Sequence, residues 1–294
     1  MDREQLLNLF SEITTWGRGD QRAPHKPLLI LYALGRWLDG EVAVTFESVN
    51  TALSELLVAF APPRKVIHTE APFWRLQNDG IWEVETSSPP TIGADGSPSK
   101  KELLRLDASG RFRPEIQSAF KKEPGLVRTL ARQILEAHFP TSLHDDICNA
   151  VGIDLLDERP AGGGRDPNFR RKVLLSYDYR CAVCGLQLLL SGTQIALEAA
   201  HIKWHQAGGP GEVRNGLCLC VMHHKLLDLG TFTVGSSREV LVSDAVAGGF
   251  GFSEHLLMFH GKPLRTPTHP VDAPFDGFTG WHRREVFHGR PRPL

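Results

Sequence analysis

Cysteine and histidine residues in the second half of the sequence have the spacing of a metal site. Cys181 and Cys184 form the pair CAVC, and Cys220 and His223 repeat the two-residue spacing in CVMH. Together they can offer three thiolates and one imidazole to a tetrahedral zinc ion, with bonds of about 2.3 Å to sulfur and about 2.0 Å to nitrogen. A lone CxxC would be ambiguous between zinc and redox chemistry, but the second pair favours zinc. The sequence therefore predicts a structural zinc site.

A second group of polar residues overlaps the first. His224 stands four residues before Asp228, so on a helix both side chains project from one face and can share a divalent cation. His201 lies in the apolar-rich segment IALEAAHIKW, which predicts a strand that ends at His201. Taken alone, a histidine at the end of a strand is usually a satisfied polar residue, and a His/Asp pair on a helix is usually a surface hydrogen bond. Their order along the chain favours a second, separate metal site.

Three further residues near these motifs are expected to lie outside both sites. Glu198 precedes His201 by three positions, and strict alternation along a strand sends its side chain to the opposite face. Cys148 and Cys218 have no partner at the two-residue spacing. We expect both cysteines to be small buried apolar residues.

The order of CAVC, LEAAHI, NGLCLC, HH and LLD between Arg180 and Phe232 resembles the HNH nuclease family. The resemblance implies a ββα-metal core, two strands and a helix, often held together by a structural zinc ion. It implies that His201 is the general base that activates water and that Asn215 holds the loop and the histidine in place.

By the same resemblance, His224 and Asp228 would bind the catalytic divalent ion, Mg²⁺ or Mn²⁺. Many members of the family have an acidic residue or a histidine directly before the base, where this chain has Ala200. The ion would then have fewer protein ligands and keep more waters and substrate oxygens.

These implied roles suit phosphodiester hydrolysis that leaves 5′ phosphate and 3′ hydroxyl ends. The reaction needs a deprotonated water in line with the leaving 3′ oxygen and a cation that stabilises the developing negative charge. An imidazole with an unperturbed pKa of about 6.5 is a suitable base at neutral pH.

Length and composition indicate a globular protein of two domains. The chain has 294 residues, of which 41% are hydrophobic and 23% charged, and its net charge of -1 neither demands nor excludes a polyanionic partner. The segment DERPAGGGRDP has almost nothing to bury and is typical of a linker. We therefore predict a first domain at 1–156, a linker at 157–167 and a second domain at 168–294.

The apolar spacing of the first domain indicates helices with a small sheet. Helices are predicted at 2–16, 27–38, 46–61, 125–139 and 142–150. The segment PFWRLQNDGIWEVE predicts two short strands around an Asn-Asp-Gly turn. The predicted fold class is α+β: a mainly helical N-terminal domain with a small β-sheet and, as the HNH resemblance implies, a C-terminal zinc-stapled ββα-metal nuclease domain.

The segments PHKPLLILYALGR and APFWRL, with an HNH domain behind them, resemble the sulfur-binding domain of phosphorothioate-dependent restriction endonucleases. In that family an apolar collar that includes a proline accepts the sulfur that replaces one non-bridging phosphate oxygen. The resemblance implies that Pro72 with Ala71 forms the collar, although members often have an aromatic residue at the position of Ala71.

Basic residues in two predicted loops complete this implied DNA site. By the resemblance, His25, Lys26 and Arg75 would flank the modified phosphate. Arg22 lies in the same loop as His25, before the second helix, where free backbone N–H groups and the helix dipole favour phosphate. The alternative interpretation is that these charges are solvated loop residues and that Phe73 and Trp74 belong to the core.

The two resemblances imply a type IV-like restriction endonuclease that recognises phosphorothioate-modified double-stranded DNA and hydrolyses it. A break in both strands needs two hydrolyses, so we expect a homodimer. Alternatives are an HNH endonuclease that recognises methylated or hydroxymethylated cytosine, and a zinc-stabilised non-catalytic DNA-binding protein. No apolar run approaches the roughly 18 residues of a membrane helix, and the N-terminal residues do not resemble a signal peptide, so we expect a cytoplasmic protein without a membrane partner.

Overall fold

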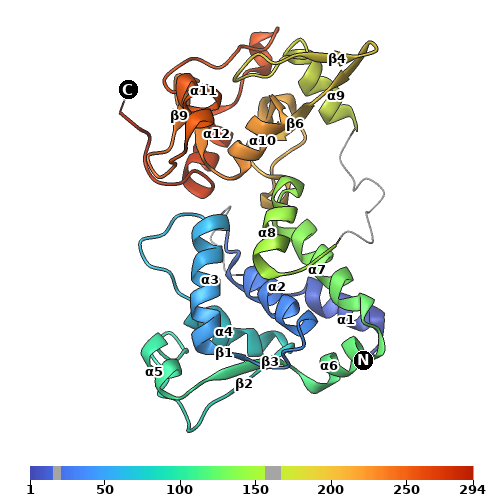
Figure 1. The fold of residues 1–294 in the computed structure, drawn as a ribbon, viewed down its shortest axis with the longest axis vertical. Helices are drawn as coiled ribbons and strands as arrows, with labels where there is room; N and C mark the ends of the chain where they lie inside the picture. The colour runs from blue at the N-terminus through green and yellow to red at the C-terminus, as the bar shows by residue number, and fades with distance from the viewer. Residues whose placement is uncertain (16–20, 156–166, 294) are drawn as a thin grey trace. The chain divides into compact units, whose positions relative to one another are not determined.

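The computed structural model describes residues 1–15, 21–155 and 167–293, and the chain divides into two compact units, Met1–Arg159 and Pro160–Leu294 (Figure 1). Nearly all of the linker predicted at 157–167 lies outside the described residues. Among the residues that the structure describes, no helix has the length and apolar character needed to cross a lipid bilayer.

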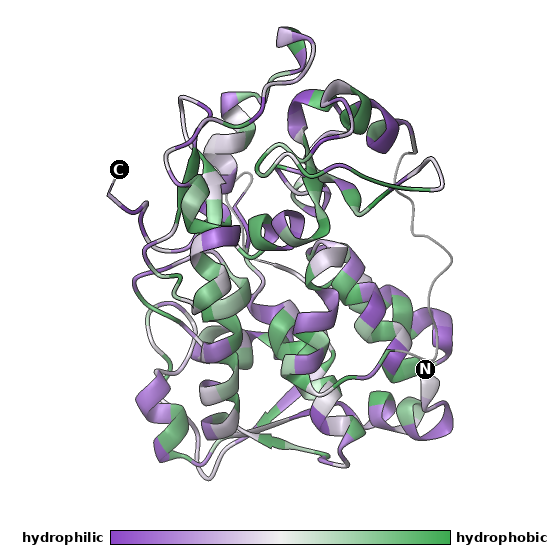
Figure 2. Ribbon diagram, turned by 45° about the horizontal axis from the view of Figure 1, so that its top comes forward, coloured by the Kyte–Doolittle hydropathy of each residue, from purple (hydrophilic) through white to green (hydrophobic). Residues whose placement is uncertain are grey.

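The first unit is built around one apolar helix. Its helices are α1 (Arg3–Ser11), α2 (His25–Leu38), α3 (Phe46–Phe60), α4 (Glu70–Arg75), α5 (Lys100–Arg105), α6 (Pro114–Lys122), α7 (Gly125–His138) and α8 (His144–Val151). Helix α2 packs against α3, α4, α7 and α8, and Leu28, Leu31 and Leu34 are fully buried. Figure 2 shows hydrophobic and hydrophilic residues side by side on the helices, as expected for helices that bury one side.

A small antiparallel sheet closes one end of this unit. Strand β3 (Ser109–Phe112) lies between β1 (Val44–Thr45) and β2 (Trp82–Glu85), and Trp82 pairs with Phe112. The ring of Phe112 makes edge contacts with Trp82 and Phe120, at 5.4 Å between centroids in each case. These contacts join the sheet to the helical core.

The prediction of two strands in PFWRLQNDGIWEVE is half wrong. The first half forms α4 and a short 3₁₀-helix, η1 (Leu76–Asp79), and only the second half is a strand, β2. Phe73 and Leu76, three residues apart, are both buried, which is the spacing of a helical face. Gly80, at φ 74°, turns the chain from η1 into β2.

The second unit contains the predicted ββα core. Strands β6 (Leu197–His201) and β7 (Gly216–Cys220) pair antiparallel, and helix α10 (Val221–Asp228) begins directly after β7. Leu197 lies opposite Cys220, and His201 lies opposite Gly216. The predicted fold class is therefore confirmed for both units (Figure 1).

Further elements surround this core. They are α9 (Pro167–Ser176), β4 (Leu188–Leu190), β5 (Thr193–Ile195), β8 (Phe232–Val234), β9 (Val240–Val242), α11 (Phe250–His255) and α12 (Asp276–Glu285). Helix α9 packs on β6 and β7, and buries Val173 and Leu174 with Leu217 and Leu219. Helices α9 and α10 therefore both cover the strand pair that carries His201.

Candidate functional site

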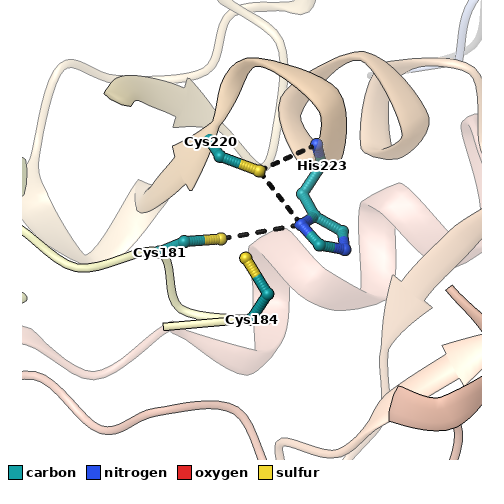
Figure 3. Close-up of side chains that lie close together, drawn as sticks. All are labelled: Cys181, Cys184, Cys220 and His223. Carbon is teal, nitrogen blue, oxygen red and sulfur yellow. Dashed lines mark hydrogen bonds between the residues drawn. The ribbon is translucent and has the colours of Figure 1, made fainter. Parts of the chain in front are cut away.

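The four predicted zinc ligands lie together (Figure 3). Their ligand atoms are all within 4.8 Å of one another. Nδ1 of His223 is 3.1 Å from Sγ of Cys220 and 3.7 Å from Sγ of Cys181. A tetrahedral zinc ion would hold a sulfur and a nitrogen about 3.5 Å apart, because its bonds are about 2.3 Å and 2.0 Å long. The arrangement therefore fits a metal ion of this kind.

The surroundings of this cluster favour metal binding. Nε2 of His223 lies 2.9 Å from the carbonyl oxygen of His255, so Nε2 donates a proton there and Nδ1 is left facing the thiols. Hydrogen bonds with Cys184 and Cys220 hold the pKa of Cys181 well below its usual range, and hydrogen bonds with Cys181 and Cys184 raise the pKa of Cys220, so the shared proton stays on Cys220. A low pKa favours the thiolate, which is the form of cysteine that binds metal.

The two remaining cysteines are buried outside the cluster, as expected. Cys218 is fully buried in β7 and Cys148 is buried in α8. Burial raises the pKa of Cys218 to about 12 and that of Cys148 to about 11. Both thiols are therefore neutral at physiological pH and behave as small apolar side chains.

His201 lies in the wall of a pocket of about 270 Å³. The pocket runs along β6, between residues of α9 and α10, and is lined by Phe169, Arg170, Ala196, Leu197, Glu198, Ala199, His201 and Val221. The imidazole of His201 stacks on the ring of Phe169, with centroids 4.0 Å apart and planes 16° apart. This stacking fixes the orientation of the ring at the end of the strand.

Asn215 holds the loop that follows His201. Its side chain is fully buried, accepts a hydrogen bond from the backbone N–H of Lys203 at 2.9 Å, and donates to the carbonyls of Lys203 and Pro210 at 3.0 and 2.9 Å. The backbone N–H of Ile202 also donates to the carbonyl of Asn215 at 2.9 Å. The arrangement suits the role that the HNH resemblance implies for this asparagine.

His224 lies between two carboxylates. Its Nδ1 is 2.6 Å from Oε2 of Glu198, and its Nε2 is 3.2 Å from Oδ2 of Asp228. Burial disfavours the charged ring, but Asp228 and Glu198 outweigh burial and raise the pKa of His224 to about 9. At neutral pH the ring therefore carries a proton on each nitrogen and bonds to both carboxylates.

The expectation that Glu198 lies away from these residues is wrong. Its carboxylate contacts His224, and its side chain lines the pocket together with His201. Alternation does place Glu198 and His201 on opposite faces of β6. The pocket, however, opens along the strand between α9 and α10, so residues of both faces reach it.

In the first unit, basic side chains gather at the start of α2. Burial, then the nearby charges of Arg64 and His68, lower the pKa of His25. Arg22 donates to the carbonyl oxygen of Phe60 at 2.8 Å, which joins the segment before α2 to the end of α3. The structure thus brings Arg22 and His25 to the segment between α3 and α4.

Lys26 and Arg75 bond to acidic residues of their own unit. Nζ of Lys26 is 2.5 Å from Oδ2 of Asp79, and the two side chains are only 14% and 5% exposed. Arg75 donates to Oγ of Ser97 at 2.9 Å and to the carboxylate of Asp95 at 3.0 Å. Both cations are therefore oriented by the protein itself.

The two residues predicted to form the sulfur collar lie in the first turn of α4. Pro72 is buried and Ala71 is half-buried. A proline is tolerated here because the first turn of a helix leaves N–H groups without helical partners. Ala71 exposes a larger fraction of its surface than Pro72.

Comparisons with known proteins match both units. Residues 3–156 match the family described as ScoMcrA-like, DNA sulfur-binding domain, and residues 181–235 match the HNH endonuclease family. No curated protein gives a significant match. The two family matches confirm the resemblances predicted from the sequence.

Several solved structures are similar to this chain. The sulfur binding domain of ScoMcrA complexed with phosphorothioated DNA is 20% identical, with a TM-score of 0.43, and covers 50% of this chain and 94% of its own. The corresponding SprMcrA complex is 15% identical, with a TM-score of 0.42 and coverages of 52% and 95%. The type IV phosphorothioation-dependent restriction endonuclease ScoMcrA is 21% identical, with a TM-score of 0.42 and coverage of 54% of this chain; the match spans only 30% of its length.

Proposed function

The chain belongs to the ScoMcrA-like DNA sulfur-binding domain family, and from this premise we propose that it is a type IV-like restriction endonuclease that recognises phosphorothioate-modified double-stranded DNA and cuts it. The observation that carries the proposal is the presence, in one chain, of this domain and of an HNH endonuclease domain at 181–235. In the second domain, a ββα core presents His201 to a pocket.

Recognition of the modified phosphate is assigned to the first turn of α4 and the basic residues near it. Ala71, with the buried Pro72 beside it in the same turn, would provide an apolar wall for sulfur, which is larger and more weakly hydrated than oxygen and therefore costs less to desolvate. A preference of about 1–3 kcal/mol, roughly tenfold to a hundredfold in affinity, is expected from such a contact. Arg22 and His25 would bind the surrounding backbone.

Lys26 and Arg75 would flank the same phosphate, but each has an acidic partner. DNA would have to share or displace Asp79 at Lys26 and Asp95 at Arg75. The pair of Lys26 is the more buried of the two, so we assign to Lys26 mainly the task of holding the start of α2 in place.

Cleavage is assigned to the pocket along β6. His201, oriented by Phe169, would take the proton from the attacking water, and Asn215 would keep the following loop in register. A divalent ion, Mg²⁺ or Mn²⁺, held at His224 would stabilise the negative charge on the phosphorane and the leaving oxygen.

Arg170 is a candidate for the phosphate contact. Its side chain lines the pocket, and its guanidinium donates to the carbonyl oxygen of Leu197 at 3.0 Å. Within the described part of the chain, no carboxylate forms an ion pair with it. Its remaining N–H groups could therefore bind a phosphate oxygen beside His201.

Two further features belong to the proposal. The cluster of three cysteines and His223 has the donor set of structural zinc and would hold the CAVC segment, β7 and α10 together. Two copies of the chain would supply the two hydrolyses of a double-strand break, which favours a homodimer.

A cleavage assay tests the proposal. Plasmid DNA with and without phosphorothioate links would be incubated with the intact protein and Mn²⁺, beside the variant His201→Ala. We expect cleavage of the modified plasmid only, with 5′ phosphate ends, and no cleavage by the variant. Equal cleavage of both plasmids would contradict the proposed specificity, and cleavage of a third, cytosine-methylated plasmid alone would establish the cytosine-reading alternative.

A further inference from the structure

The two carboxylates that contact His224 lie in different surroundings. The side chain of Glu198 is 39% exposed and lines the pocket that contains His201, whereas that of Asp228 is 2% exposed. They also approach different ring nitrogens, Glu198 at Nδ1 and Asp228 at Nε2. The two nitrogens point away from each other in the ring plane, so one ion cannot bind both.

From this geometry we infer that the catalytic divalent ion is bound by Glu198 and Nδ1 of His224, and that Asp228 is a positioning residue that holds the ring through Nε2. The inference rests on the proposed nuclease function and changes the ligand set within it. It replaces the pairing of His224 with Asp228 that the helical spacing suggested.

Access to the substrate supports this assignment. An ion that stabilises charge on the scissile phosphate must be within bonding distance of that phosphate, and the phosphate must be near His201. Glu198 and His201 line the same pocket, together with Val221 at the start of α10. The Nδ1 side of His224 faces Glu198, so it is the side from which an ion in the pocket reaches the ring.

The spacing of the atoms also fits. An octahedral Mg²⁺ with bonds of about 2.0–2.1 Å places adjacent ligands about 2.9 Å apart. Oε2 of Glu198 and Nδ1 of His224 are 2.6 Å apart, so a small separation of the two side chains admits the ion in place of the shared proton.

The contact of Nε2 of His224 with Asp228 is of the kind that orients a metal-bound histidine. Metal-bound histidines commonly donate the N–H of the second nitrogen to a carboxylate, which fixes the ring and its tautomer. Asp228 comes from the same helix as His224, one turn later, and is buried. Glu198 comes from β6, which lies beside α10 (Figure 1). It provides a carboxylate on the strand that carries His201, where the residue directly before His201 is Ala200.

Mn²⁺ binding to the intact, zinc-loaded protein tests the assignment. The amount of free Mn²⁺ would be measured by electron paramagnetic resonance for the wild type, Glu198→Gln, Asp228→Asn and the control Glu254→Gln, which changes an exposed carboxylate on α11. Asparagine keeps a carbonyl oxygen that can accept the N–H of Nε2. We therefore expect Glu198→Gln to weaken Mn²⁺ binding on the order of tenfold or more, and Asp228→Asn to weaken it by a smaller factor.

The nitrogen that binds the ion gives a second measurement, which does not depend on activity. With saturating Mg²⁺, ¹⁵N spectra of histidine side chains would identify His224 by the signals missing in His224→Gln. We expect a proton on Nε2 and none on Nδ1. A proton on Nδ1 with Nε2 bound, or a larger loss for Asp228→Asn than for Glu198→Gln, would overturn the inference alone. Absence of any Mn²⁺ binding beyond the zinc site would overturn both the inference and the proposed ion-dependent cleavage.

Discussion

We expect that replacing Gly216 by alanine impairs cleavage without changing recognition of modified DNA. Gly216 lies in β7 directly opposite His201, where helix α9 crosses the strand pair. Its φ of -123° is ordinary for any residue, so the requirement for glycine arises from space and not from backbone conformation.

The expected magnitude follows from the distances. A Cβ at position 216 would lie 2.4 Å from Cγ2 of Val173 and 3.1 Å from the ring of Phe169. Non-bonded carbons prefer separations of about 3.5–4.0 Å, so the overlap with Val173 is about 1 Å. Overpacking of this kind costs about 1–3 kcal/mol of stability. Because Phe169 stacks on His201, a shift of about 1 Å in α9 moves the base and can lower the cleavage rate about a hundredfold.

The assay is single-turnover cleavage of a modified duplex, with binding of the same duplex measured in parallel. Gly211→Ala is the matched control, because a Cβ at position 211 meets no atom within 4 Å. We expect the control to cleave at the wild-type rate and both variants to bind DNA as the wild type does. Wild-type cleavage by Gly216→Ala would refute the claim that the close packing of α9 positions His201.

Three further predictions concern other parts of the molecule. Cys220→Ala should lose zinc and the cooperative unfolding of the second unit, because a structural zinc ion contributes folding free energy directly. A variant that keeps its zinc content and its melting profile would contradict the ligand set. Arg170→Ala should slow cleavage on the order of tenfold to a hundredfold, with partial rescue by added guanidinium. The control Arg171→Ala changes an exposed arginine outside the pocket lining and should cleave at the wild-type rate. Equal rates for the two variants would remove Arg170 from the phosphate site. Lys26→Met should destabilise the first unit by about 2–4 kcal/mol, because it leaves Asp79 buried without its cation; a normal denaturation midpoint would show that the pair contributes little.

The metal cluster could be predicted because it depends on short-range spacing, whereas the ββα core was implied by the resemblance to the HNH nuclease family. The two-residue intervals that follow Cys181 and Cys220 let both ligands of each pair bind one ion, and this depends only on local sequence. The apolar runs of α2 and α3 likewise fix their helices by local periodicity. These features needed no knowledge of tertiary contacts.

The features that could not be predicted depend on contacts between distant segments. Glu198 reaches His224 because α10 packs beside β6, and alternation along one strand contains no information about that packing. The ion pair of Lys26 with Asp79, which lies far along the chain, could not be predicted from the residues around Lys26. In APFWRL, the aromatic residues favour a strand locally, whereas the core buries Phe73 and Leu76, three residues apart, which is the spacing of a helical face.

Binding of two matched duplexes tests the central claim most directly. The duplexes have the same sequence and differ only in one phosphorothioate, and the dissociation constant of the intact protein for each is measured at the same salt concentration. We predict a Kd about tenfold to a hundredfold lower for the modified duplex. Equal Kd values for the two duplexes would contradict the account of this chain as a nuclease directed by sulfur in DNA.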